Sequence, residues 1–165
     1  MKLYYKNIEE KDLELVKEIY DWYITNSTAT FHTDPITIQG LKELLYFNHS
    51  LYDSFLIYAD DELAGYCFTT HFKKRQAYNG TAEVTIYLKD GFGGKGIGKN
   101  TLSFLEEKAK GKGIKNLLGI ITGDNTGSIA LFERMGYFKC AHFKNVGVKF
   151  GKVLDVVGYQ KEIQE

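Results

Sequence analysis

Apolar residues recur along the chain at two different spacings, and the spacing predicts which segments are helices and which are strands. Leu13, Val16, Ile19, Tyr20 and Tyr23 lie near the 3.6-residue interval and predict an amphipathic first helix. Shorter apolar runs bounded by turn residues predict strands at 3–8, 54–59, 63–72, 81–88, 114–121, 137–144 and 152–161.

Three more helices are predicted from capping residues and apolar stripes. Thr37 is expected to cap the second helix, with Ile38, Leu41, Leu44 and Leu45 facing inward. The third helix runs through Leu102, Leu105 and Ala109 and is stopped by Gly111 and Gly113, and the fourth spans 125–134 and is closed by Gly136.

The order of these elements indicates an α/β, mixed α+β fold. The early strands are joined by a short turn at Asp60 and Asp61, which favours antiparallel pairing, whereas the helix between 81–88 and 114–121 implies a parallel crossover. We therefore expect a mixed, mostly antiparallel sheet of about seven strands with about four helices on both faces, in a single domain spanning 1–165.

Composition narrows the possible functions. The 165 residues are 44% hydrophobic, and 21 basic residues balance 21 acidic ones, so no global charge would attract nucleic acid or an anionic membrane. The four histidines and the two cysteines lack the spacing of metal ligands, so no metal is expected, and both Cys67 and Cys140 are predicted to be buried thiols. The charged N-terminus and the absence of a long apolar run favour a soluble cytoplasmic protein.

A glycine-rich segment, GFGGKGIGKN at 91–100, follows the 81–88 strand and opens a helix. Glycines there allow several amide groups and a helix N-terminus to point at one phosphate group. The dinucleotide fingerprint fits poorly, because no acidic residue lies between Glu107 and Asp124, and the P-loop template fits poorly because Asn100 replaces its Ser or Thr. The loop is therefore interpreted as a pyrophosphate site, with a plain surface turn as the alternative.

Glu83 is the candidate catalytic group. Ala82 and Val84 belong to the apolar face of their strand, so two-residue alternation places Glu83 on the other face with Thr85 and Tyr87. A carboxylate in the middle of a sheet either forms a structural ion pair or lines a cleft. The strand pattern by itself leaves both options open.

Several motifs in the same order resemble the GCN5-related N-acetyltransferase (GNAT) superfamily, and more closely its phosphinothricin acetyltransferase branch. They are STATF (27–31), RQAYNGTAEVTIY (75–87), GKGIG (94–98), the helix with Asn125, Ser128 and Glu133, and VGVKFGKVLDV (146–156). The resemblance covers nearly the whole chain. It implies acetyl-CoA as cosubstrate and a small amino acid of the phosphinothricin, methionine sulfoximine or methionine sulfone type as acceptor.

The resemblance also implies roles for individual residues. Glu83 would be the general base for direct attack of the amine on the thioester. The residues implied in acetyl-CoA binding are Ile86, Tyr87, Leu88, Gly93, Gly94, Lys95, Gly96, Ile97, Gly98, Lys99, Asn100, Asn125, Ser128 and Phe132. Those implied at the acceptor are Thr30, Phe31, Arg75, as a carboxylate clamp, and Tyr78.

The chain departs from the branch at two places. Gly93 and Gly94 stand where relatives carry Gln or Arg at the head of the phosphate loop, so Lys95 and Lys99 are expected to supply positive charge. Phe132 stands where relatives place a proton-donating Tyr or His, which leaves water or another tyrosine to protonate the CoA thiolate.

The sequence therefore predicts an acetyl-CoA-dependent amino-acid N-acetyltransferase. The alternatives are a nucleotide-binding protein or NTPase that uses 91–100, and a CoA-binding protein without transferase activity. The expected partners are a small amine, no nucleic acid, no membrane and a second copy of the chain. The homodimer is implied by the resemblance, because members of the branch usually form dimers, and is also expected from the apolar residues Phe143, Val146, Val148 and Phe150.

Overall fold

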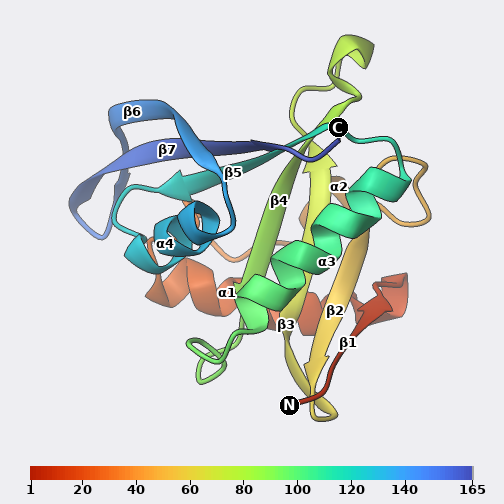
Figure 1. Ribbon diagram of the computed structural model, residues 1–165. Coiled ribbons are helices and arrows are strands. Elements are labelled where there is room, and N and C mark those ends of the chain that lie inside the picture. Colours follow the sequence, from red (N-terminus) through yellow and green to blue (C-terminus); the bar gives the residue numbers. More distant parts are fainter. Residues whose placement is uncertain (165) are drawn as a thin grey trace.

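The computed structural model describes residues 1–164, which form one seven-stranded sheet in the order β1-β2-β3-β4-β5-β7-β6 (Figure 1). The strands are β1 (Leu3–Asn7), β2 (Ser54–Ala59), β3 (Glu62–His71), β4 (Thr81–Leu88), β5 (Asn116–Thr122), β6 (Phe138–Lys149) and β7 (Lys152–Glu162). The helices are α1 (Leu13–Asn26), α2 (Ile38–Leu44), α3 (Ile97–Gly111) and α4 (Thr126–Arg134), with short 3-10 turns at Glu10–Asp12 and Gln76–Tyr78. The predicted fold class is confirmed.

The turn and cap residues act locally as the sequence predicts. The Thr37 hydroxyl accepts a hydrogen bond from the Gly40 amide at 2.9 Å and so caps α2. Asp60 and Asp61 adopt positive φ angles of 49° and 67° in the tight β2–β3 turn. One expectation for α2 is wrong: Leu44 is 37% exposed, because α2 ends there and the chain turns into extended backbone at Leu45.

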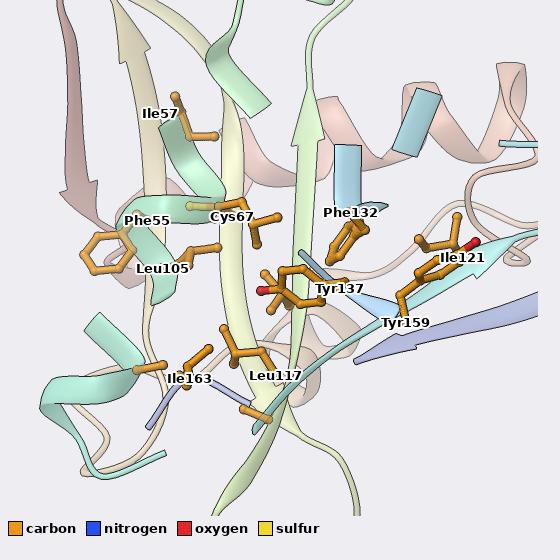
Figure 2. Close-up of a cluster of buried hydrophobic side chains, with 14 of the residues drawn as sticks. Phe55, Ile57, Cys67, Leu105, Leu117, Ile121, Phe132, Tyr137, Tyr159 and Ile163 are labelled. Atoms are coloured by element: carbon orange, nitrogen blue, oxygen red, sulfur yellow. The ribbon is translucent and has the colours of Figure 1, made fainter. Parts of the chain in front are cut away.

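Helices cover both faces of the sheet, as expected. On one face, α3 and α4 pack over a cluster that includes Leu105, Leu117 and Tyr137, whose side chains converge between the strands and helices in Figure 2. On the other face, α1 and α2 pack over a cluster that includes Leu13 and Tyr66. Burial of these side chains on both faces supplies the main stabilising free energy of the fold.

The hairpin formed by β6 and β7 projects at one edge of the sheet (Figure 1). β6 is longer than the predicted strand, and most of its residues are exposed. The expectation that both cysteines are buried is wrong for Cys140, which is exposed in this strand, whereas Cys67 is buried in the core. Cys140 lies on the edge strand β6, at a register shift between Lys139 and Ala141, which leaves it exposed to solvent.

No helix among residues 1–164 has the length and apolar character needed to cross a bilayer.

Candidate active site

The main cleft arises because β4 and β5 pair over a short distance only. These parallel strands are in register from Thr81–Glu83 against Asn116–Leu118, and beyond that point the two strands diverge (Figure 1). The divergence opens a cavity of about 810 Å³, lined by 84–91 and 119–122 and closed at its ends by the glycine-rich loop and by α4. We call it the large groove.

Most residues predicted to bind acetyl-CoA line the large groove. They are Ile86, Tyr87, Leu88, Gly93, Gly94, Gly96, Gly98, Lys99, Asn125, Ser128 and Phe132. Lys95, Ile97 and Asn100 do not line it, and the Ile97 side chain is fully buried in the core.

The glycine-rich loop has the geometry of an anion site. Gly91, Gly94 and Gly96 adopt φ angles of +91°, +73° and +82°, which other residues rarely tolerate. Gly96 is the N-cap of α3 and offers no side-chain cap, so the first amides of the helix lack intrahelical acceptors and remain available to a ligand. The first turn carries no acidic residue, and Lys99 adds a positive charge there.

The far wall of the large groove is formed by β5 and α4. The Asn125 side chain accepts a hydrogen bond from the Ser128 amide at 3.2 Å and caps α4. Phe132 is buried, and its ring occupies the space that a Cβ at Gly119 would need, since ring atoms lie 2.5–2.9 Å from that position. Phe132 therefore packs as a structural side chain against β5, in the wall of the large groove.

Part of the lining could not be predicted from the sequence. The end of α1 and the loop after it contribute Trp22, Tyr23, Asn26, Ser27, Thr28 and Ala29, and the end of α4 contributes Arg134. The Tyr23 hydroxyl donates a hydrogen bond to the Leu88 carbonyl and so ties α1 to β4. No local sequence pattern indicates that these residues line the groove, because the groove is formed by segments that are far apart in the sequence.

A second, smaller cavity of about 170 Å³ lies on the α1–α2 face of the sheet, and we call it the small pocket. Its lining residues are Tyr20, His32, Leu41, Leu44, Leu45, Tyr66, Phe68, Thr70, Glu83, Thr85 and Tyr87. Thr85 and Tyr87 also line the large groove, so the two cavities meet at β4.

Glu83 lines the small pocket, on the strand face that the alternation predicts. Burial raises the pKa of its carboxyl to about 6, although the positive charge of Lys73 opposes this rise. Within the described residues the carboxylate has no hydrogen-bond or ion-pair partner from the protein. The structural ion-pair interpretation of Glu83 therefore loses its support, and the carboxylate is left free to accept a proton.

None of the four predicted acceptor residues belongs to the lining of the small pocket. Thr30 is buried, and its hydroxyl hydrogen-bonds at 2.6 Å to the hydroxyl of Tyr20, which also contacts His32 Nδ1. Phe31 is 39% exposed, and its ring packs directly on Gly147 of β6.

Arg75 and Tyr78 lie together outside both cavity linings. The Arg75 guanidinium is exposed, 5.7 Å from the centre of the Tyr78 ring, and the ring also packs edge-on against Phe72.

A buried lysine, which no sequence pattern indicates, fixes the loop that follows α1. Lys149 of β6 is 3% exposed, and its Nζ donates hydrogen bonds to the carbonyls of Ser27 at 2.6 Å and Thr30 at 2.8 Å. On the opposite side of this loop, the Thr122 hydroxyl donates to the Thr28 carbonyl at 2.7 Å. These hydrogen bonds pre-organise the loop where Ser27, Thr28 and Ala29 line the large groove.

Comparison with known proteins shows the family to which the chain belongs. A family model described as an acetyltransferase (GNAT) domain matches residues 6–157, so the chain belongs to the GNAT family of acetyltransferases. The predicted family and acyltransferase class are confirmed, and acetyl-CoA is the cosubstrate of this family.

Individual relatives are similar over almost their whole length. YwnH of Bacillus subtilis is 34% identical over 90% of this chain and 91% of its own. An L-methionine sulfoximine/L-methionine sulfone acetyltransferase of Pseudomonas aeruginosa is 28% identical over 90% of this chain and 88% of its own. The crystal structure of a GNAT-superfamily phosphinothricin acetyltransferase from Sinorhizobium meliloti in complex with acetyl-CoA superimposes with a TM-score of 0.90 at 27% identity, covering 98% of this chain and 89% of the other.

Proposed function

We propose that this protein transfers acetyl from acetyl-CoA to the α-amine of a small amino acid, with the whole chain acting as one catalytic domain. The observation that carries the proposal is the meeting of the two cavities at β4, where Glu83 lines the small pocket and Thr85 and Tyr87 line both. Relatives that act on methionine sulfoximine, methionine sulfone and phosphinothricin support this acceptor class.

The donor would occupy the large groove, with its pyrophosphate at the amides that begin α3 and its thioester arm along the unpaired part of β4. Lys99 and Arg134 line the groove and would balance the phosphate charge in place of the side chains missing at Gly93 and Gly94. Acetyl-CoA should therefore stabilise the protein against heat, by about 2.7 kcal/mol at 100 times its dissociation constant. Stabilisation by ATP with Mg²⁺ but not by acetyl-CoA would instead favour a nucleotide-binding protein.

In the reaction, Glu83 accepts a proton from the acceptor's ammonium group, directly or through water. The free amine then attacks the thioester carbonyl, so that a C–N bond forms and the C–S bond breaks. The new amide nitrogen releases its surplus proton to solvent, and the departing CoA thiolate takes up one proton from water or from a tyrosine. Phe132 has no proton to donate, so that residue has no part in this last step.

The raised pKa of Glu83 predicts a pH dependence. The carboxylate works as a base only when it is ionised, so kcat/KM should fall as the pH drops through about 6. Because the charge of Lys73 lowers this pKa, the variant Lys73→Met should move the acidic inflection to higher pH. An inflection at the ordinary carboxyl pKa, unmoved by Lys73→Met, would speak against a buried Glu83 as base.

Arg75 is proposed to bind the acceptor's carboxylate, because its exposed guanidinium can form a bidentate pair. Arg75→Ala should raise KM about tenfold for amino acids and leave KM for amines without a carboxylate nearly unchanged. Lys74→Ala, at the exposed neighbouring lysine, is the matched control. Equal increases in KM for both kinds of acceptor would instead assign Arg75 a structural role.

We further propose a homodimer that uses the β6–β7 hairpin. Phe143, Val146, Val148 and Phe150 are all exposed, with Val148 at 67%, which is unusual for a cluster of apolar side chains on a free surface. Light scattering coupled to size-exclusion chromatography should give twice the 18.8 kDa chain mass, and Val148→Lys should shift the mass toward the monomer. A monomeric, fully active wild-type protein would contradict the dimer. The cytoplasmic location stays a prediction.

A further inference from the structure

We infer that the small pocket selects acceptors with an electrically neutral side chain and discriminates against anionic ones. This inference rests on the proposed function, since it concerns the amino acid that Glu83 would deprotonate. The charge of the side chain divides the acceptors of the relatives into two groups. Phosphinothricin carries an anionic phosphinate, whereas methionine sulfone carries a neutral group of the same shape.

The lining of the small pocket carries the inference. Seven of its side chains are aliphatic or aromatic: Tyr20, Leu41, Leu44, Leu45, Tyr66, Phe68 and Tyr87. The others are two threonines, His32 and the Glu83 carboxylate. No lysine or arginine contributes to this lining within residues 1–164.

The nearby cations lie outside the pocket. Lys73 is exposed, with its ammonium 5.5 Å from the centre of the Phe72 ring, and its charge already acts on Glu83. Arg75 is exposed against Tyr78 and is proposed to hold the α-carboxylate. Neither residue belongs to the lining, so neither offers a direct ion pair to a second anionic group within the pocket.

An anionic side chain in this pocket would be unfavourable for two reasons. It would lose its hydration without gaining a counter-ion, and it would lie in the same cavity of about 170 Å³ as the ionised Glu83. A neutral sulfone needs only hydrogen-bond donors for its oxygens, and the hydroxyls of Thr70 and Thr85 belong to the lining. Its methyl and methylene groups would pack on the surrounding aromatic and leucine side chains.

The test uses methionine sulfone and phosphinothricin as a matched pair, with acetyl-CoA at pH 8, where the Glu83 carboxyl, with a pKa of about 6, is ionised. We expect kcat/KM for the sulfone to exceed that for phosphinothricin by about 100-fold or more. Because both compounds share the α-amino-acid part, Arg75 contributes equally to both values, and the ratio isolates the side-chain charge.

A charge variant tests the cause. Leu44 lines the pocket from the end of α2 and is 37% exposed, so a longer side chain there can be accommodated. Leu44→Lys adds a cation and should reduce the ratio at least about tenfold by improving kcat/KM for phosphinothricin. Leu44→Met adds similar length without charge and should leave the ratio within about threefold of wild type.

The possible outcomes distinguish a failure of the charge selectivity from a failure of the proposed function. Equal kcat/KM for both compounds in the wild type would overturn the charge selectivity. So would an unchanged ratio in Leu44→Lys, provided that this variant unfolds cooperatively and is therefore folded. In both cases the acetyltransferase proposal stands. No turnover of either compound, in a protein that binds acetyl-CoA, would overturn the proposed acceptor class and the selectivity with it.

Discussion

Glu83→Gln is expected to lower kcat by about 100-fold or more at neutral pH, the range associated with loss of a general base. Glutamine keeps the shape of the side chain but cannot accept the proton of the ammonium group. Acetyl-CoA affinity should remain near the wild-type value, because Glu83 lines the small pocket and not the large groove. Steady-state kinetics and calorimetry with acetyl-CoA measure the two effects separately.

The matched control is Glu107→Gln, which makes the same change on the exposed side of α3 and should leave kcat near wild type. An unchanged kcat in Glu83→Gln, with the chemical step shown to be rate-limiting, would remove Glu83 from the mechanism.

Gly65→Ala is expected to lower the free energy of unfolding by about 3 kcal/mol or more. A Cβ at Gly65 would lie 2.2 Å from the Tyr87 carbonyl oxygen and 2.9 Å from the Leu88 Cα, both of them backbone atoms that side-chain rotation cannot move. Urea denaturation measures the loss. Since Tyr87 and Leu88 also line the large groove, the folded fraction should bind acetyl-CoA more weakly.

Gly80→Ala serves as the control, since a Cβ there meets no atom within 4 Å. A similarly small change in stability for both variants would show that β3 and β4 are not as closely apposed as the structure has them.

Local patterns in the sequence predicted the features that depend on neighbouring residues. Alternation along β4 placed Glu83 on the correct face, and the capping role of Thr37 followed from its position before an apolar stripe. The position of the glycine-rich loop between a strand and a helix likewise followed from the local pattern.

Features that depend on distant contacts could not be predicted in this way. Lys149 reaches carbonyls 119 and 122 positions earlier in the chain, and its sequence neighbours give no sign that it is buried. Cys140 is exposed because β6 is an edge strand, which depends on the order of strands in the sheet. The divergence of β4 and β5 likewise follows from tertiary pairing and carries no local signal.

The central claim is that the meeting of the two cavities at β4 is a site of acetyl transfer to an amine. Incubation of the protein with acetyl-CoA and a panel of amino acids, polyamines, aminoglycosides and peptides, with thiol release and N-acetyl products both measured, tests this claim most directly. We expect an N-acetylated small amino acid, formed in equal amount with free CoA by the wild type and at least about 100-fold more slowly by Glu83→Gln. Thiol release without any acetylated amine, or equal product formation by both proteins, would contradict it.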